Sequence, residues 1–395
     1  MGFCATEQPT IGESKRVQEQ GCLSPPRSVQ VPRPCIFDRC SLLDISPRRT
    51  LRKGGFKRYI FNRSGCAQNM PKVLHIGPCD SPGGMANVMR ILAEHPPEGW
   101  EAELLASHVV GSPWAKWVAY RKARKTLIRM LNDPAQRPDV VHLHTAADWS
   151  WWRKRRFAHL AHGAGSSVVV HIHSGKFDTW LKSKSKKFKR RLKLELRGKD
   201  IQVVVLTEDW IKLLEKDLGN LVSISNPLEP KYKTIIRENT QNHLLLLGRN
   251  DPVKGHSFVV EIALRLKSDF PDLVMTMTGV DESAVDWIKA SGWVTESEKM
   301  RLLSTASVLL LPSEFEGQPM VVIESLASGL PVVADSRLHS LPKEVLFADP
   351  DIESWCQILT DALEHPKSIK FDSSEYDLAT VRKKWKNLYV SLIDS

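Results

Sequence analysis

The sequence predicts an α/β protein whose parallel sheets are built from strands joined by helices. Short, continuously apolar runs such as residues 243–247 and 308–311 are typical of strands that are buried on both faces. A loop rich in Gly, Pro or polar residues follows each of these runs, and a segment with helical periodicity follows the loop. This order begins at residue 72 and recurs toward the C-terminus, so we expect doubly wound parallel sheets.

The most informative of these units is the stretch of residues 308–333. Its apolar strand leads into a polar loop, and Pro319 suits the first turn of the helix that follows. Gly329 suits the position just past the end of that helix, and Pro331 prevents its continuation. The next strand can then begin at residue 332. The stretch therefore predicts one strand–loop–helix–strand crossover.

Two carboxylates stand in this unit, Glu316 in the loop and Glu324 inside the helix. Free amides and the positive dipole end of a helix N-terminus can hold a phosphate or sugar hydroxyls. A carboxylate beside a diphosphate serves as an acceptor for hydroxyls, which points to a sugar and a ribose. The alternative is a buried helix whose two acids are solvated or paired with cations.

The segment Glu-Phe-Glu-Gly-Gln-Pro-Met-x3-Glu-Ser-Leu-Ala-Ser-Gly-Leu-Pro-Val-Val resembles the Glu-x7-Glu signature of retaining glycosyltransferases of family 4. That family has two Rossmann-like domains that face a cleft, the GT-B fold, with a C-terminal helix packed back on the first domain. The resemblance implies that Glu324 binds the ribose hydroxyls. It also implies a set of residues that contact the donor sugar: Glu316, Gly317, Gln318, Pro319, Met320 and Val321.

Three further motifs occur in the order that this resemblance requires. Gly83 and Gly84 lie in the loop after the first strand and resemble the family's first glycine loop, which lies between acceptor and donor. Arg249 and Lys254 stand in Gly-Arg-x4-Lys-Gly, and the resemblance assigns both as ligands of the donor diphosphate. His173 matches a histidine that faces the donor sugar in the family, although a satisfied histidine at a strand end is the alternative. The resemblance makes Glu316, His173, Arg249 and Lys254 the catalytic candidates.

Two expected strands end in His-x-His, with His142 and His144 on one strand and His171 and His173 on the other. Strand alternation places the two histidines of each pair on one face, so a divalent metal site is an alternative. No carboxylate or Cys lies at ligand spacing. We therefore expect no metal and no other cofactor.

The length of the chain and the positions of its cysteines limit the possible domain organisation and cellular compartment. A chain of 395 residues is long enough for two domains, and no apolar run reaches the length of a membrane span. Five of the seven cysteines precede residue 70, which fits a reducing compartment. We expect residues 1–70 to be disordered or an over-extended start. The predicted folded parts are an acceptor domain (71–226), a donor domain (227–372) and a C-terminal crossover helix (373–395).

The net charge of +11 is unevenly spread along the chain. Residues 1–70 carry +7, residues 71–220 carry +11 and residues 221–395 carry −7. Three segments of the first domain combine Trp or Phe with dense positive charge: 114–129, 149–157 and 177–199. Such composition favours an anionic membrane surface. Nucleic acid is a rival partner, but no known nucleic-acid module is present. A merely solvated basic face is the third option.

Together these features predict a retaining, metal-independent hexosyltransferase that moves a sugar from a nucleotide-diphosphate sugar to a glycan or lipid-linked acceptor. Surface polysaccharide or glycoconjugate synthesis is the expected setting, in a cytoplasmic protein that can also bind the inner face of the membrane peripherally. One alternative is a nucleotide-sugar epimerase on the same scaffold. The other is a non-catalytic protein that binds membrane or nucleic acid. The sugar, the base, the acceptor and the oligomeric state are left open by the sequence.

Overall fold

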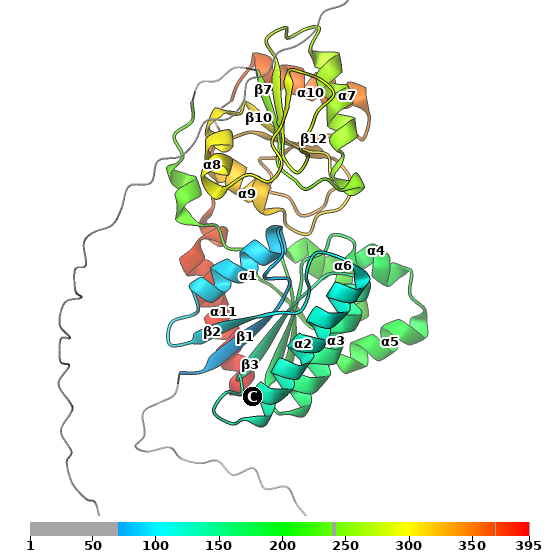
Figure 1. Ribbon diagram of the computed structural model, residues 1–395, viewed down its shortest axis with the longest axis vertical. Coiled ribbons are helices and arrows are strands. Elements are labelled where there is room, and N and C mark those ends of the chain that lie inside the picture. The colour runs from blue at the N-terminus through cyan, green and yellow to red at the C-terminus, as the bar shows by residue number, and fades with distance from the viewer. Residues whose placement is uncertain (1–69, 239–241, 368, 395) are drawn as a thin grey trace, which may run out of the picture. The chain divides into compact units, whose positions relative to one another are not determined.

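The computed structural model describes residues 70–238, 242–367 and 369–394. The predictions of a disordered or over-extended segment for residues 1–69 lie outside the described residues, whereas Met70 is inside them. Within the described part, strands and helices alternate along the chain, as Figure 1 shows. The predicted α/β class is therefore confirmed.

The first sheet contains six parallel strands in the order β2-β1-β3-β4-β5-β6. Its central strands β3 and β4 are buried along their whole length, which explains their continuously apolar character apart from the histidines. The edge strand β2 is largely exposed and carries Glu101 and Glu103, as suits a sheet edge. The bounds are β1 Lys72–Gly77, β2 Glu101–Ala106, β3 Val140–Thr145, β4 Ser167–Ile172, β5 Ile201–Val205 and β6 Leu221–Ser223.

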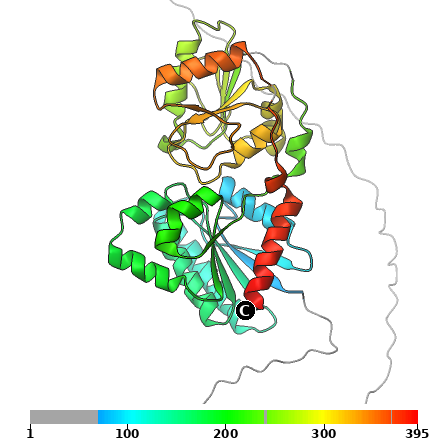
Figure 2. The ribbon, with the colours of Figure 1, turned by 180° about the vertical axis from the view of Figure 1, so that it is seen from behind.

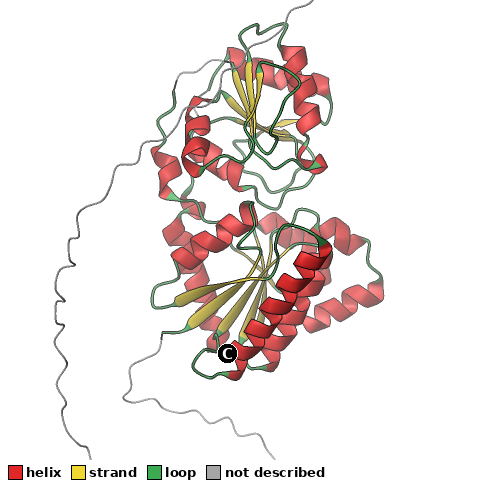
Figure 3. Cartoon of the chain, viewed as in Figure 1, coloured by secondary structure: helices red, strands yellow, loops and turns green. Residues whose placement is uncertain are grey.

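The second sheet also has six parallel strands, in the order β12-β11-β10-β7-β8-β9. Strands β7, β10 and β11 are buried throughout and form the centre of the sheet. Figure 3 shows that helices flank the strands of each sheet. The bounds are β7 His243–Leu246, β8 Val274–Met277, β9 Ile288–Ala290, β10 Val308–Leu311, β11 Val332–Asp335 and β12 Leu346–Ala348.

Helices connect the strands of both sheets and begin and end near the Gly, Pro and polar residues that punctuate the sequence. The helix in the Glu-x7-Glu stretch begins at Met320, because Pro319 is its N-cap. The bounds are α1 Gly84–Glu94, α2 Pro113–Asn132, α3 Trp149–Gly163, α4 Phe177–Lys182, α5 Lys186–Glu195, α6 Glu208–Leu218, α7 His256–Leu266, α8 Glu296–Thr305, α9 Met320–Ala327, α10 Ile352–Glu364 and α11 Leu378–Ile393.

The strand orders determine where ligands can bind. In a doubly wound sheet, ligands bind beyond the carboxyl ends of the strands where the strand order reverses. In the second sheet this point lies between β7 and β10, which are neighbours. The loop after β7 carries Arg249, and the loop after β10 carries Glu316. The topology thus brings together two motifs that are 67 residues apart in the sequence.

The last helix, α11, packs on the first sheet, as predicted (Figure 2). Val381, Trp385 and Leu392 are buried in one cluster with residues of β1, β3 and β4. Ser167 at the start of β4 donates a hydrogen bond of 3.0 Å to the carbonyl of Leu392. Tyr389 lies on the same face and is also buried. The large apolar and aromatic residues of α11 thus form the face that packs on the first sheet.

No helix among the described residues is both long enough and apolar enough to cross a bilayer. The two cysteines in this part, Cys79 and Cys356, are buried and unpaired, so no disulfide constrains it.

Candidate functional site

The carboxylate of Glu316 and the ammonium of Lys254 form an ion pair in the structure. Both side chains are largely buried, Glu316 at 12% and Lys254 at 25% exposure, so water screens the pair only partly. The sequence analysis assigned both residues to the donor site from separate motifs. In the structure their side chains meet beyond the carboxyl ends of β7 and β10.

Gly255 fixes the position of Lys254. Its φ of 70° lies in the left-handed region, and a Cβ there would lie 2.9 Å from Cγ of Pro312. The short turn that contains Lys254 therefore packs closely against the start of the loop after β10. The glycine of the Lys-Gly motif is explained by this contact.

Arg249 lies more openly than Lys254. Its side chain is 58% exposed and pairs with Asp251, whose carboxylate lies 3.1 Å from a guanidinium nitrogen. Asp251 also caps the turn of residues 252–254 by accepting from the amide of Val253 at 3.3 Å. Asp251 thus links Arg249 to the turn that carries Lys254. The guanidinium keeps donors free for an anionic ligand.

The loop after β4 lies directly against the loop that carries Glu316. A Cβ on Gly317 would overlap the carbonyl oxygen of His173, and a Cβ on Gly175 would overlap the backbone of Glu316. Two glycines are therefore required for the backbones to approach this closely. The loops that carry His173 and Glu316 therefore meet through their backbones.

Two of the predicted donor residues have structural contacts that the sequence did not reveal. The side chain of Gln318 is buried and accepts a hydrogen bond of 2.6 Å from the amide of Asn226. Met320 packs into the cluster formed by β1, β3, β4, α1 and α11. For both residues the side chain has a packing role, which leaves their backbone as the part that can face a donor.

The remaining positions around the start of α9 agree with a backbone binding site. The indole nitrogen of Trp210 donates to the carbonyl of Gly317 at 2.9 Å and so orients that peptide. Val321 is half-buried, in the first turn of α9. Gly84 is also close, since a Cβ on it would lie 4.0 Å from Cγ of Met320. Gly83, with a φ of 129°, precedes α1 in a conformation that favours glycine.

Glu324 is buried, with 2% exposure, and is paired with Lys299 of α8 at 3.0 Å. Burial raises the pKa of Glu324, and the Lys299 ammonium partly offsets this shift. Its second oxygen, Oε1, is buried and has no hydrogen-bond partner. An unsatisfied carboxylate oxygen costs free energy, so this atom is a suitable acceptor for ligand hydroxyls. The sequence analysis did not predict Lys299 as a site residue, because the charged segment that contains it is typical of a solvent-exposed helix and does not indicate a contact with Glu324.

We predict that Lys299→Met lowers the free energy of unfolding by about 2 kcal/mol at pH 8, because it leaves the Glu324 charge buried and unpaired. The folded state holds the Glu324 proton more tightly than the unfolded chain does, so it binds more protons and its stability falls as pH rises. The loss should therefore be smaller at pH 5 than at pH 8, as measured by urea unfolding. Adding Glu324→Gln should abolish this pH dependence, and a loss that is equal at both pH values would contradict the explanation.

The four histidines of the two His-x-His segments form one cluster, in which His173 is only partly buried, and His75 of β1 joins them. His75 lies opposite His142 in the parallel register of β1 and β3, and its ring contacts those of His142 and His144. Burial lowers the pKa of His75 and of His173 to about 3. All five rings are therefore neutral at physiological pH. The sequence signal for His75 was a lone polar residue inside an apolar strand.

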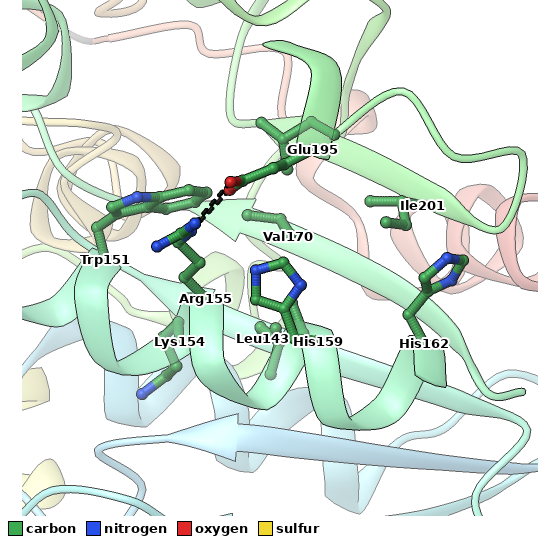
Figure 4. Close-up of a pocket in the computed structure, with 11 residues that line it drawn as sticks. Leu143, Trp151, Lys154, Arg155, His159, His162, Val170, Glu195 and Ile201 are labelled. Carbon is green, nitrogen blue, oxygen red and sulfur yellow. Dashed lines mark hydrogen bonds and ion pairs between the residues drawn. The ribbon is translucent and has the colours of Figure 1, made fainter. Parts of the chain in front are cut away.

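One hollow lies between α3, the end of α5 and the first sheet, and a second lies between α3 and α5. Neither is close to the predicted donor residues in the sequence. Figure 4 shows the first of them, with the Arg155–Glu195 ion pair at its rim. Its volume accessible to solvent is about 50 Å³, enough for a few water molecules but too small for a nucleotide sugar. Neither hollow is lined by a residue that the sequence predicted for the site.

Comparison with solved structures defines the class of fold. Sucrose-phosphate synthase from Thermosynechococcus elongatus superposes with a TM-score of 0.61 at 15% identity, over 82% of this chain and 99% of that one. The catalytic domain of starch synthase IV from Arabidopsis thaliana superposes with a TM-score of 0.53 at 12% identity, over 83% and 100%. At this identity the likeness shows the fold alone, and that fold is GT-B with two Rossmann-like domains.

Sequence comparison is more specific about the chemistry. Residues 241–365 match the family model described as glycosyl transferases group 1. An uncharacterized glycosyltransferase of Haemophilus influenzae is 30% identical over 215 residues, which are 47% of this chain and 60% of that relative. An MMP alpha-(1->4)-mannosyltransferase of Mycolicibacterium hassiacum is 26% identical, over 33% of this chain and 36% of its own length. The matched part of this chain thus spans about 60% or less of the length of each of these two relatives.

Proposed function

We propose that the protein is a retaining glycosyltransferase of the family 4 type, which uses a nucleotide-diphosphate sugar and needs no metal for the transfer step. The observation that carries the proposal is the meeting of Glu316 and Lys254 at the switch point of the second sheet. The glycosyltransferase relatives and the group 1 family match support the same class of reaction.

In this mechanism Lys254 and Arg249 bind the donor diphosphate and neutralise the charge that develops on it as the sugar departs. Lys254 would exchange its ion pair with Glu316 for the diphosphate, which would free the Glu316 carboxylate to accept hydroxyls of the donor sugar. The amides at the start of α9 would bind the sugar as well. Glu324 would accept the ribose hydroxyls with its unpaired oxygen. The acceptor hydroxyl attacks from the face that the diphosphate leaves, and a phosphate oxygen takes its proton.

We predict that one nucleoside diphosphate among UDP, GDP and ADP binds in the micromolar range, and that Lys254→Ala weakens this binding at least tenfold. The loss follows because one charge-assisted contact to a phosphate is worth about 1.5–3 kcal/mol. Isothermal calorimetry measures it. Lys289→Ala, which changes an exposed lysine on β9, is the matched control and should bind as the wild type does. Equal affinity in both variants, or no binding by any nucleotide, would contradict the proposed donor site.

The proposed acceptor is a glycan or a lipid-linked glycan presented at an anionic membrane surface. The structure narrows the basic surface that would face such a membrane. In the segment 177–199, Phe177 and Trp180 are buried, and Lys189 pairs with Asp217. In the segment 149–157, Lys154 is buried against Ser107 at 2.6 Å, and burial lowers its pKa to about 7. Part of each segment is therefore packed in the core or paired with an acid, whereas Trp149, Lys186 and Arg190 are exposed.

The start of α2 has the features that a membrane-facing surface requires. Trp114 and Trp117 stack on each other at 4.8 Å and are 69% and 47% exposed. Arg121 lies over the Trp117 ring at 5.1 Å, and the helix contains no acidic residue. Exposed indoles prefer the headgroup boundary, and the cations attract anionic lipids. We therefore place the membrane contact on this end of α2.

We predict that the double variant Trp114→Ala, Trp117→Ala binds vesicles of phosphatidylglycerol and phosphatidylcholine roughly tenfold more weakly, because it removes two interfacial side chains. Vesicle cosedimentation measures the effect. Trp293→Ala removes an equally exposed tryptophan near α8 and is the control that should leave binding unchanged. If wild-type protein prefers nucleic acid over vesicles, or if the double variant binds vesicles normally, the membrane contact is wrong.

A further inference from the structure

Five histidines of the first sheet, four of them buried and His173 partly buried, form two hydrogen-bonded groups whose rings contact one another. Nδ1 of His144 lies 2.9 Å from Nε2 of His173, and Nε2 of His144 lies 3.0 Å from Nδ1 of His75. Nε2 of His142 lies 3.1 Å from Nδ1 of His171. The network is built from three neighbouring strands, β1, β3 and β4, or from the residue that directly follows β4. Its members therefore hold fixed positions in the most rigid part of the sheet.

Three of these rings converge on one point. His144, His171 and His173 each offer a nitrogen such that all three atoms lie within 4.8 Å of one another. Nδ1 of His171 is already engaged with His142, whereas its Nε2 is buried and has no partner. A buried imidazole nitrogen without a partner costs free energy unless something occupies the space in front of it. The unsatisfied atom and the convergence of the rings are independent signs of a ligand.

We propose that His144, His171 and His173 bind one divalent ion of the zinc class. Three imidazole nitrogens form an established zinc-binding set, and a tetrahedral ion at about 2.0–2.1 Å from each nitrogen spaces them roughly 3.4 Å apart. The present separation of 2.9 Å between His144 and His173 needs only a small widening. Calcium and magnesium are not suitable, because both prefer oxygen ligands and this cluster has none.

The remaining histidines provide the hydrogen bonds that orient such ligands. Metal-bound histidines usually donate their second N–H to a neighbouring acceptor. His144 can donate from Nε2 to His75, and His171 can donate from Nδ1 to His142. His142 in turn can donate from its own Nδ1 to the hydroxyl of Tyr389, 2.7 Å away on α11. These tautomers are mutually consistent, and they leave a lone pair on each of the three ligand nitrogens.

Binding requires a change of tautomer in the pair His144 and His173, because one of these rings donates to the other when no ion lies between them. His173 is the partly exposed member of the three, so an ion would enter from its side. The bound ion would fix the loop that follows β4, whose Gly175 contacts the backbone of Glu316. The ion would thus hold this loop in place without taking part in chemistry, and the proposal does not depend on the proposed transfer reaction.

The test is the metal content of the full chain, purified without chelators from zinc-supplemented medium, followed by titration of the stripped protein. We expect about one zinc per chain and a rise in the unfolding temperature that grows with the logarithm of free zinc. Cobalt should substitute and give the visible absorption bands of a tetrahedral nitrogen site without thiolate charge-transfer bands, which distinguishes these histidines from the chain's cysteines. Magnesium and calcium should produce no shift.

Variants separate this site from other histidines. His144→Gln and His171→Gln should abolish the stoichiometric zinc, and His75→Gln should weaken zinc binding roughly 10–100-fold. His243→Gln is the control, because His243 is buried in the second sheet with Thr276 as its partner. Zinc that survives His144→Gln would overturn the proposal. So would a wild-type protein that neither retains zinc nor shifts its unfolding temperature on titration, a result that does not require any variant to fold.

Discussion

Replacement of Glu316 by glutamine is expected to lower kcat/KM for sugar transfer by roughly 10²–10³-fold, or about 2.7–4 kcal/mol of transition-state stabilisation. The variant keeps the shape of the side chain and removes its charge. It also removes the ion-pair partner of Lys254, so the ammonium becomes more available to a phosphate. Binding of the nucleoside diphosphate should therefore stay the same or tighten while transfer is lost.

Lys254→Ala should differ from Glu316→Gln in nucleotide binding, because it should weaken both nucleotide binding and transfer. Glu314→Gln is the matched control, since Glu314 is an exposed carboxylate in the same loop. Steady-state kinetics together with calorimetry distinguish these outcomes. A Glu316→Gln enzyme with wild-type kcat/KM would show that the carboxylate serves only to pair with Lys254.

The second large effect is expected from Gly317→Ala, which should reduce kcat/KM at least 100-fold and lower the unfolding temperature by several degrees. The added methyl group would overlap the carbonyl of His173 and lie 3.1 Å from a methyl of Leu206. Overpacking of this kind costs about 1–3 kcal/mol and forces the backbone to move. Because Glu316 precedes this glycine, its carboxylate would be displaced, and a displacement of 1 Å can cost 100-fold in rate.

Gly175→Ala should reproduce this result from the other side of the contact, since its methyl group would overlap the backbone of Glu316. Gly163→Ala is the control, because a Cβ at the end of α3 meets nothing within 4 Å. That variant should be as active as the wild type and equally stable or slightly more stable. Normal activity in Gly317→Ala would mean that the two loops separate without consequence for the site.

The sequence predicted the fold and the main features of the candidate site because those features are local or follow from topology. Apolar runs and turn residues mark strands and helices, and parallel strand order then places Glu316 beside Lys254 without any knowledge of side-chain contacts. The C-terminal helix was predicted for the same reason, and its buried residues Val381, Trp385 and Leu392 follow helical spacing.

Features that depend on long-range side-chain contacts could not be predicted. Gln318 is a residue type that often contacts ligands, but its side chain accepts a hydrogen bond from the amide of Asn226 and donates one to the carbonyl of Leu206. Both partners are distant in the sequence. The Lys299–Glu324 ion pair joins α8 and α9, and the sequence does not indicate which residues of these two helices face each other. The basic aromatic segments were read as one surface, whereas the structure buries Trp180 and Lys154. Charge and aromatic content alone do not show which side chains point outward.

The most direct test of the central claim is acceptor-dependent release of nucleoside diphosphate from a panel of nucleotide sugars. The acceptors would be short glycans and glycolipids in anionic vesicles, and NMR would report the anomeric configuration of the product. We predict release that requires an acceptor, a product with the configuration of the donor, and loss of the reaction in Glu316→Gln. Conversion of the nucleotide sugar to its epimer without acceptor would contradict this function, as would nucleotide binding that survives Lys254→Ala with no turnover of any donor.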